Sequence, residues 1–143
     1  MQTIVREDLS PRLRLAITRT ARRLRQEADA GLSPSLTAAL ATLERHGPLT
    51  PSRLAEIERI QRPTVTRLLA TLENDGLVER VADPDDGRVS IVSVTKEGRA
   101  LVKKLRSRKN AYLSKRLRHL DDEDLETLER ATAILERILE GPE

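Results

Sequence analysis

The segment from Gln61 to Thr95 is the feature that most restricts what this chain can fold into. Its first half places apolar side chains at i, i+3, i+4 and i+7, which is the spacing of a helix with one buried face. These residues are Val65, Leu68, Leu69 and Leu72. Its second half holds two β-rich runs, 77–81 and 89–94, on either side of a turn over 83–87. The segment therefore predicts one amphipathic helix followed directly by one β-hairpin.

Proline and glycine indicate where the other helices begin and end. Proline is favoured at the first helical position, and serine or threonine is favoured as the residue that caps it. The relevant pairs are Ser10-Pro11, Ser33-Pro34, Thr50-Pro51 and Arg62-Pro63, with Thr95 and Asp121 as further N-caps and Gly31, Gly47, Gly76 and Gly141 as stops. The predicted helices cover 11–30, 34–46, 51–58, 63–75, 96–120 and 122–139. The fold class is thus mainly α with a small β-hairpin, in the order α-α-α-α-β-β-α-α.

Composition limits both the core and the chemistry. Tyr112 is the only aromatic residue, so the core must be built from leucine, valine, isoleucine and alanine, and a chain of this kind gains by burying further surface in a dimer. The absence of cysteine excludes disulfides, cysteine-ligated zinc and thiol redox sensing. Residues 96–118 are mostly basic and residues 121–143 mostly acidic, a pattern for which two solvated helix faces are the simplest interpretation.

Several classes of protein are not supported by the sequence. No apolar run approaches the roughly 18 to 20 residues of a membrane span, and the N-terminal residues lack the apolar stretch of a signal peptide. We therefore expect a cytoplasmic protein without a membrane partner. His46 and His119 have no neighbour at metal-ligand spacing, and no nucleophile–base arrangement is readable. The sequence thus predicts no enzyme activity, no metal site and no cofactor.

The helices 51–58 and 63–75 are separated by a short turn, which is typical of a helix-turn-helix. With Val65 packed inward, the side chains of Arg62, Thr66 and Arg67 fall on the opposite face, near the helix N-terminus. Arginine can bind guanine through two hydrogen bonds, and threonine can contact a base or a thymine methyl group. On this helix alone, the alternative is that both arginines are ordinary surface residues of a helical hairpin.

The hairpin favours the nucleic-acid interpretation. Asp86 and Arg88 lie two residues apart beside the turn, where a carboxylate can hold a guanidinium through paired hydrogen bonds. An arginine on such a wing suits a narrow minor groove. The alternative is that Asp86 only supports the turn and Arg88 is solvated. A basic hairpin directly after a helix-turn-helix favours the first interpretation, so the segment predicts a winged helix-turn-helix.

Six motifs together resemble the MarR family of bacterial transcriptional regulators, closely over the middle half of the chain. They are Leu54-Ala55-Glu56, Thr64-Val65-Thr66-Arg67-Leu68, Leu72-Glu73, Gly76-Leu77-Val78-Glu79-Arg80, Asp83-Pro84-Asp85-Asp86-Gly87-Arg88 and Val94-Thr95. The resemblance implies one MarR-like domain over 1–143, with a DNA-binding lobe at 34–95 and dimerisation helices at 1–31 and 96–143. It also implies double-stranded DNA as a partner and a homodimer.

The resemblance assigns roles to individual residues. Major-groove and phosphate contacts fall to Gln61, Arg62, Pro63, Thr64, Thr66 and Arg67. Arg88 corresponds to the wing arginine and Asp86 to its support. Two residues depart from the family pattern. Arg59 stands where many members have glycine, at a cost of up to about 1 kcal/mol if its φ is positive. Gly87 stands where many have a second wing arginine, which predicts fewer phosphate contacts.

Apolar stripes on the terminal helices predict the dimer interface independently. The residues are Leu9, Leu13 and Ile17 near the start, Leu113, Leu117 and Leu120 in the fifth helix, and Leu135 and Leu139 in the last. A pair of helices from one chain cannot bury these stripes well, so a second subunit is expected. The alternative is that the same stripes pack within one chain.

The resemblance further implies a repressor that a small ligand releases from an inverted-repeat operator. That ligand usually binds a cleft between the dimer helices and the winged lobe, and the sequence does not assign its residues here. Because Tyr112 is the sole aromatic residue, we expect no pocket built on aromatic stacking. The alternative function is a winged-helix module that binds proteins and has no specific DNA binding.

Overall fold

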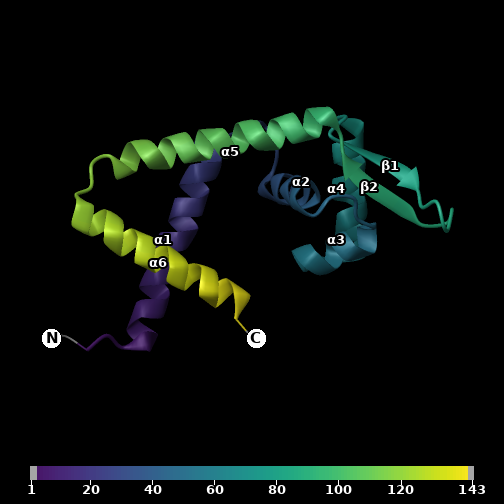
Figure 1. Cartoon of the computed structure of the whole chain (residues 1–143). Helices are drawn as coiled ribbons and strands as arrows, with labels where there is room; N and C mark the ends of the chain where they lie inside the picture. The colour runs from purple at the N-terminus through teal and green to yellow at the C-terminus, as the bar shows by residue number, and fades with distance from the viewer. Residues whose placement is uncertain (1–2, 142–143) are drawn as a thin grey trace.

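The computed structural model describes residues 3–141, and Figure 1 shows a lobe at one end of a long helix. The elements are α1 (Arg6–Glu27), α2 (Pro34–His46), α3 (Pro51–Glu58), α4 (Arg62–Asn74), β1 (Val78–Ala82), β2 (Ser90–Val94), α5 (Lys96–Leu117) and α6 (Asp122–Glu140). The lobe consists of α2, α3, α4 and the hairpin, and α5 runs from it toward α1 and α6. The order and fold class agree with the prediction.

The apolar face of α4 forms the centre of the lobe core. Val65, Leu69 and Leu72 are fully buried, and Leu68 packs against them while half-buried. Their partners come from α2, α3 and β2 and are Leu40, Leu43, Leu54 and Val92. The predicted helical periodicity therefore identified the buried face of α4. The opposite face of α4 remains free for another partner.

The predicted caps fix where four of the helices begin. Ser33 Oγ accepts a hydrogen bond from Leu36 N at 3.2 Å, and Thr50 Oγ1 accepts one from Arg53 N at 3.1 Å. Asp121 Oδ1 accepts one from Asp124 N at 2.9 Å. Thr95 caps α5 in the same way. Each oxygen satisfies an N–H that has no partner within its helix, which stabilises a helix end by about 1 kcal/mol.

The prediction for the first helix was wrong at both ends. α1 begins at Arg6 instead of Pro11, and Ser10 Oγ donates to the carbonyl oxygen of Arg6 rather than capping a helix. Pro11 lies in the second turn of α1, where it removes one backbone hydrogen bond and crowds the preceding turn, while Glu7 and Asp8 in the first turn favour the helix dipole. The helix ends at Glu27 instead of residue 30, and the next residue, Ala28, is buried.

Smaller corrections apply around the hairpin. The strands pair antiparallel from Val78 opposite Val94 to Ala82 opposite Ser90, so each begins one residue later than predicted. Leu77 is excluded from β1 because its N–H caps α4 by donating to Leu72 O at 2.9 Å. An isolated bridge between Leu49 and Val92, not predicted, adds a second, single-residue pairing to β2.

The helices α2 and α3 have the predicted bounds, whereas the bounds of α4, α5 and α6 differ by one to three residues. α4 begins one residue before Pro63, α5 ends at Leu117 instead of residue 120, and α6 extends to Glu140. Across the described residues 3–141, no helix is long and apolar enough to cross a membrane.

The apolar stripes on the terminal helices remain largely uncovered in a single chain. Leu9, Ile17 and Leu117 are exposed, and Leu139 is 85% exposed. The other four predicted interface residues are half-buried: Leu13, Leu113, Leu120 and Leu135. No described side chain of α6 is buried. Packing within one chain therefore covers these stripes only in part.

Candidate nucleic-acid interface

A left-handed turn joins α3 to α4. Arg59 has φ 54° and ψ 45°, and it is the only described non-glycine residue with positive φ. Its N–H donates to Glu56 O, and the N–H of Ile60 donates to Ala55 O at 3.1 Å. A side chain in this region costs about 1 kcal/mol relative to glycine. The turn reverses the chain so that the N-terminal ends of α3 and α4 lie near each other.

The polar face of α4 is exposed as predicted. The exposed residues are Gln61, Arg62, Pro63, Thr66 and Arg67, while Thr64 is half-buried. The first turn of α4 contains no acidic residue. Arg62 and Arg67 therefore present two cations on one face without a carboxylate in that turn. This arrangement suits a polyanion whose grooves accept a helix.

The sequence did not predict one contact of this face. Arg62 Nη1 donates a hydrogen bond to Ser52 Oγ, at the start of α3. This contact links the start of α3 to an exposed arginine at the start of α4. The only signal in the sequence was the position of Ser52 directly after the predicted helix start at Thr50-Pro51.

The wing brings Asp86 and Arg88 together. Asp86 Oδ1 accepts from Arg88 N at 3.1 Å and lies 3.4 Å from Arg88 Nε. One carboxylate oxygen thus serves both nitrogens, instead of the paired guanidinium contact that was predicted. The Arg88 side chain is 95% exposed and so remains available for a partner.

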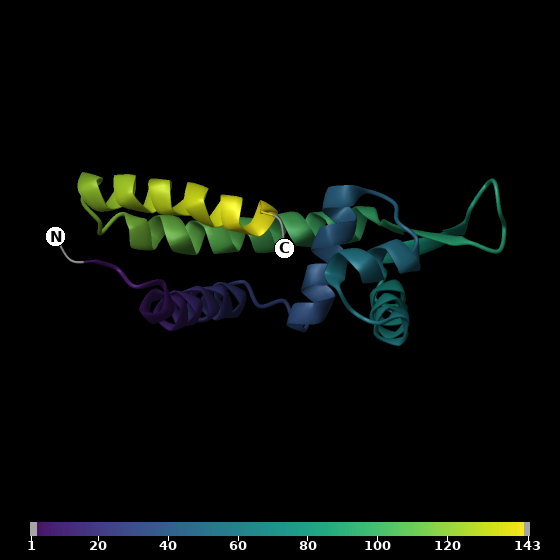
Figure 2. The same cartoon turned by 90° about the horizontal axis from the view of Figure 1, so that it is seen from below.

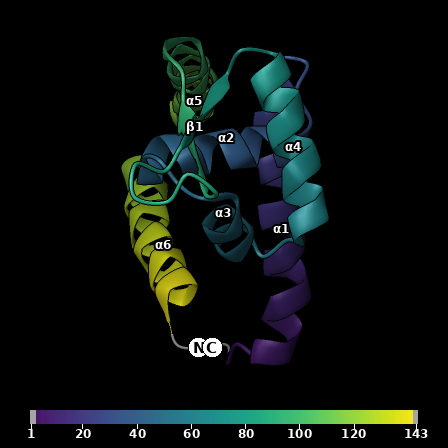
Figure 3. The same cartoon turned by 90° about the vertical axis from the view of Figure 1, so that its right-hand side faces the viewer.

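The wing is tied to α4 but reaches away from the lobe. Arg80 Nε, on β1, lies 2.9 Å from Glu73 Oε2 on α4. Figure 2 shows the hairpin extending beyond the lobe, and Figure 3 shows α4 and the hairpin facing the same side. A duplex approaching that side meets both elements, so the spacing between helix and wing is set by the protein.

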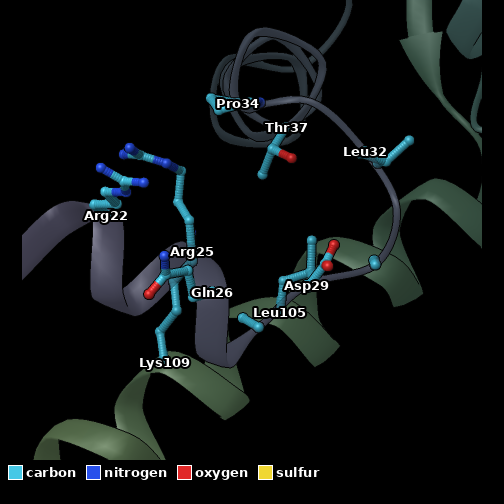
Figure 4. A pocket seen from close by; sticks show the side chains of 11 residues that line it. Arg22, Arg25, Gln26, Asp29, Leu32, Pro34, Thr37, Leu105 and Lys109 are labelled. Carbon is cyan, nitrogen blue, oxygen red and sulfur yellow. The ribbon is translucent and has the colours of Figure 1, made fainter.

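A separate cavity of about 280 Å³ lies between α1, α2 and α5. Figure 4 shows Arg22 and Arg25 on one side of it, with Asp29 opposite. Lys109 of α5 adds a third cation, and Asp29 is the only acid in the lining. Asp29 Oδ1 accepts a hydrogen bond from Gly31 N at 2.8 Å. The cavity therefore has an excess of positive charge. The sequence did not predict this cavity, because its lining residues come from separate helices that only the fold brings together.

An exposed cationic helix followed by a wing defines the winged helix-turn-helix of a DNA-binding transcriptional regulator. The family model described as the MarR family matches residues 32–90. An uncharacterised HTH-type transcriptional regulator of Mycobacterium leprae is 40% identical over 136 residues, which covers 94% of this chain and 95% of that protein. The chain belongs to the MarR family. This family and the similar proteins are transcriptional regulators, which are not enzymes.

Solved structures agree with this assignment. A putative transcriptional regulator from Pseudomonas aeruginosa is 32% identical, with a TM-score of 0.85 over 96% of this chain and 100% of that chain. A mutant of MepR from S. aureus, bound to an oligodeoxyribonucleotide, has a TM-score of 0.70 at 22% identity, over 92% of this chain and 97% of that chain. The second likeness concerns the fold alone.

Proposed function

We propose that this protein is a homodimeric repressor that binds an inverted-repeat DNA operator and is released by a small anionic ligand. The exposed face of α4 is the observation that carries the proposal. Arg62, Thr66 and Arg67 point away from a fully buried core, and the first turn of α4 has no acid. Such a helix fits the major groove with its N-terminal residues on base edges. A role on DNA also places the protein in the cytoplasm.

We assign base contacts to Arg62, Thr66 and Arg67 and supporting phosphate contacts to Gln61, Pro63 and Thr64. The long side chains on the exposed face can reach base edges, whereas the half-buried Thr64 remains close to the backbone. Arg88 would enter the adjacent minor groove, where A·T-rich DNA concentrates negative potential. Asp86 would hold Arg88 in position through the contact to its Nε.

We assign dimerisation to residues 1–31 and 96–143 and DNA binding to 34–95. The uncovered side chains of Leu9, Ile17, Leu117 and Leu139 support the first assignment, because a second copy would remove them from water. The same interface would include Leu13, Leu113, Leu120 and Leu135. A two-fold dimer presents two α4 helices, which is why the operator would be an inverted repeat. The MepR mutant shows that this fold can hold an oligodeoxyribonucleotide.

The cavity of Figure 4 is our candidate effector site. Its cations Arg22, Arg25 and Lys109 would bind a carboxylate or phosphate group. The helix α2 lines this cavity through Pro34 and Thr37 and reaches the lobe core through its later residues. A ligand that changes the position of α2 would therefore move α4 relative to the other subunit.

Replacing Arg25 with glutamine should abolish release by the ligand and preserve DNA binding.

An electrophoretic mobility shift against genomic fragments tests the main proposal. We expect a discrete shifted fragment that survives excess nonspecific DNA. The double variant Arg62→Ala/Arg67→Ala should lose this selectivity. Its helix content, measured by circular dichroism, should remain that of the wild-type protein. If the wild-type protein selects no fragment, the proposal fails and the alternative of a winged-helix module that binds proteins is favoured.

A further inference from the structure

Three exposed residues of α4 lie in one row along the face that we assign to the major groove. They are Arg62, Thr66 and Ala70, which are spaced four residues apart and so share one side of the helix. The only carboxylate of α4 belongs to Glu73, and its Oε2 lies 2.9 Å from Arg80 Nε on the wing. The row therefore presents one guanidinium followed by two short side chains to a partner.

The hydroxyl group of Thr66 is used within the helix. Thr66 Oγ1 donates a hydrogen bond to the carbonyl oxygen of Arg62 at 3.0 Å. A threonine hydroxyl carries a single hydrogen, so Thr66 cannot donate to a base while this bond is made. With Oγ1 turned back toward the preceding turn, the Cγ2 methyl is the part of the side chain that is left to face outward.

The neighbours of Thr66 allow this methyl group to reach a base edge. Pro63 and Ala70 are exposed on the same face and are small, so neither holds the helix away from the floor of a groove. The guanidinium of Arg62 reaches back to Ser52 Oγ at the start of α3. Thr66 can therefore meet a base directly, although its own side chain is short.

The edges of the base pairs in the major groove offer one methyl group, the C5 methyl of thymine, beside their hydrogen-bond donors and acceptors. A protein methyl pressed against a donor or acceptor displaces its water and gives no hydrogen bond in return, which is unfavourable. Contact with the thymine methyl has no such cost, and it removes apolar surface from water. The geometry of Thr66 thus favours thymine over the other three bases.

We infer that Thr66 recognises one thymine in each half-site through contact between its Cγ2 methyl and the C5 methyl of the base. The hydroxyl group of Thr66 has no part in this recognition, because it is bonded to Arg62 O. This inference rests on the DNA binding proposed above, and it adds the chemical group that Thr66 recognises and the base that the operator must carry.

Replacing thymine with uracil tests the inference, since uracil pairs like thymine and lacks only the C5 methyl. The probe is the genomic fragment selected by the wild-type protein, with deoxyuridine placed at one thymine position at a time in both half-sites. At one position, binding should weaken by about fourfold for each methyl removed, and so by about fifteenfold for the pair of half-sites. Fluorescence anisotropy with labelled duplexes measures the affinities.

Two variants of Thr66 separate the methyl from the hydroxyl. Thr66→Val keeps a methyl and removes the hydroxyl, so it should retain the preference for thymine over uracil. Thr66→Ser keeps the hydroxyl and removes the methyl, so it should bind both duplexes as weakly as the wild-type protein binds the uracil duplex. The two variants and two duplexes form double-mutant cycles, which cancel any effect of uracil on the shape of the DNA. Circular dichroism should show the wild-type helix content for both variants.

Thr71→Ser is the matched control. Thr71 is also exposed on α4, and its Oγ1 donates to the carbonyl oxygen of Arg67 at 3.2 Å in the same way. It lies five residues after Thr66 and so roughly 140° around the helix from it. Removing its methyl should leave the preference for thymine over uracil unchanged.

The outcomes separate this inference from the proposed function. If uracil is tolerated at every position, or if Thr66→Ser keeps the wild-type preference for thymine, the inference is wrong and the proposed function stands. If Thr66→Val loses affinity for the thymine duplex whereas Thr66→Ser keeps it, the hydroxyl contacts DNA and the methyl contact is overturned. If the wild-type protein selects no fragment, the proposed function fails and the inference fails with it.

Discussion

Arg62 lies where α4 begins, and its guanidinium reaches back to Ser52 at the start of α3. A hydrogen bond of this kind restricts a long side chain that would otherwise sample many rotamers in solution. The restriction lowers the entropy lost when the arginine binds a base. We therefore propose Arg62, ahead of Arg67, as the residue that reads sequence.

Replacing Arg62 with alanine tests this role. If Arg62 binds a guanine, the variant should lose about 1–3 kcal/mol of operator binding free energy and relax its preference at one base position. If it binds only phosphate, the loss should be uniform across sequences. Competition with operators that differ by single bases distinguishes the two results. A variant with unchanged affinity would remove Arg62 from the interface.

Replacing Asp86 with alanine changes the affinity for DNA in a direction that distinguishes two roles of this residue. Simple electrostatics predicts tighter DNA binding, because an acid that repels phosphate is removed. The contacts from Asp86 Oδ1 to the N and Nε of Arg88 predict the opposite, because the wing arginine loses its support. We therefore expect the Asp86→Ala variant to bind DNA more weakly. For Arg88→Ala, we expect the slope of log affinity against log salt concentration to fall by about one unit per wing if a phosphate contact is lost. Tighter binding of the Asp86 variant at every salt concentration would show that the wing is only a generic charged loop.

At the scale of elements, the start of α5 locks the hairpin to α4. Thr95 Oγ1 donates to Gly76 O at 2.7 Å, and Thr95 N donates to Leu77 O at 3.0 Å. Gly98 is buried in the first turn of α5 against the same backbone. A Cβ on Gly98 would lie 2.1 Å from Leu77 O and 2.8 Å from Val94 Cγ1. This junction therefore has no room for a side chain.

The Gly98→Ala variant should destabilise the fold by about 1–3 kcal/mol, because overpacking against backbone outweighs the gain in helix propensity of about 1 kcal/mol. Urea unfolding followed by circular dichroism measures the difference in free energy. Gly87→Ala is the matched control, since a Cβ there meets no atom within 4 Å. Equal stability of the two variants would show that the junction can open without cost.

At the scale of the whole molecule, the proposed dimer sets the form of the operator. Two α4 helices related by a two-fold axis should bind half-sites in inverted orientation. Their centres should lie about 10 bp apart, which is one turn of the duplex. Hydroxyl-radical footprinting on a selected fragment checks the spacing. Protection of a single half-site would contradict a symmetric dimer on DNA.

The sequence alone determined the features that depend on near neighbours. Ser33 and Thr50 cap their helices through bonds to residues three positions on, and the apolar spacing of Val65 and Leu69 selects the buried face. Asp86 and Arg88 are only two residues apart, so their contact could also be expected. These features depend on interactions between residues that are close in the sequence, so the sequence alone predicts them.

Tertiary structure decided what depends on distant partners. Thr95 N meets Leu77 O, and Leu49 pairs with Val92, only once the helices and the hairpin have packed together. Arg62 meets Ser52 because the left-handed turn at Arg59 folds α4 back beside α3. Such contacts depend on the relative placement of whole helices, which is set by packing of the shared core and is not encoded in any short stretch of residues.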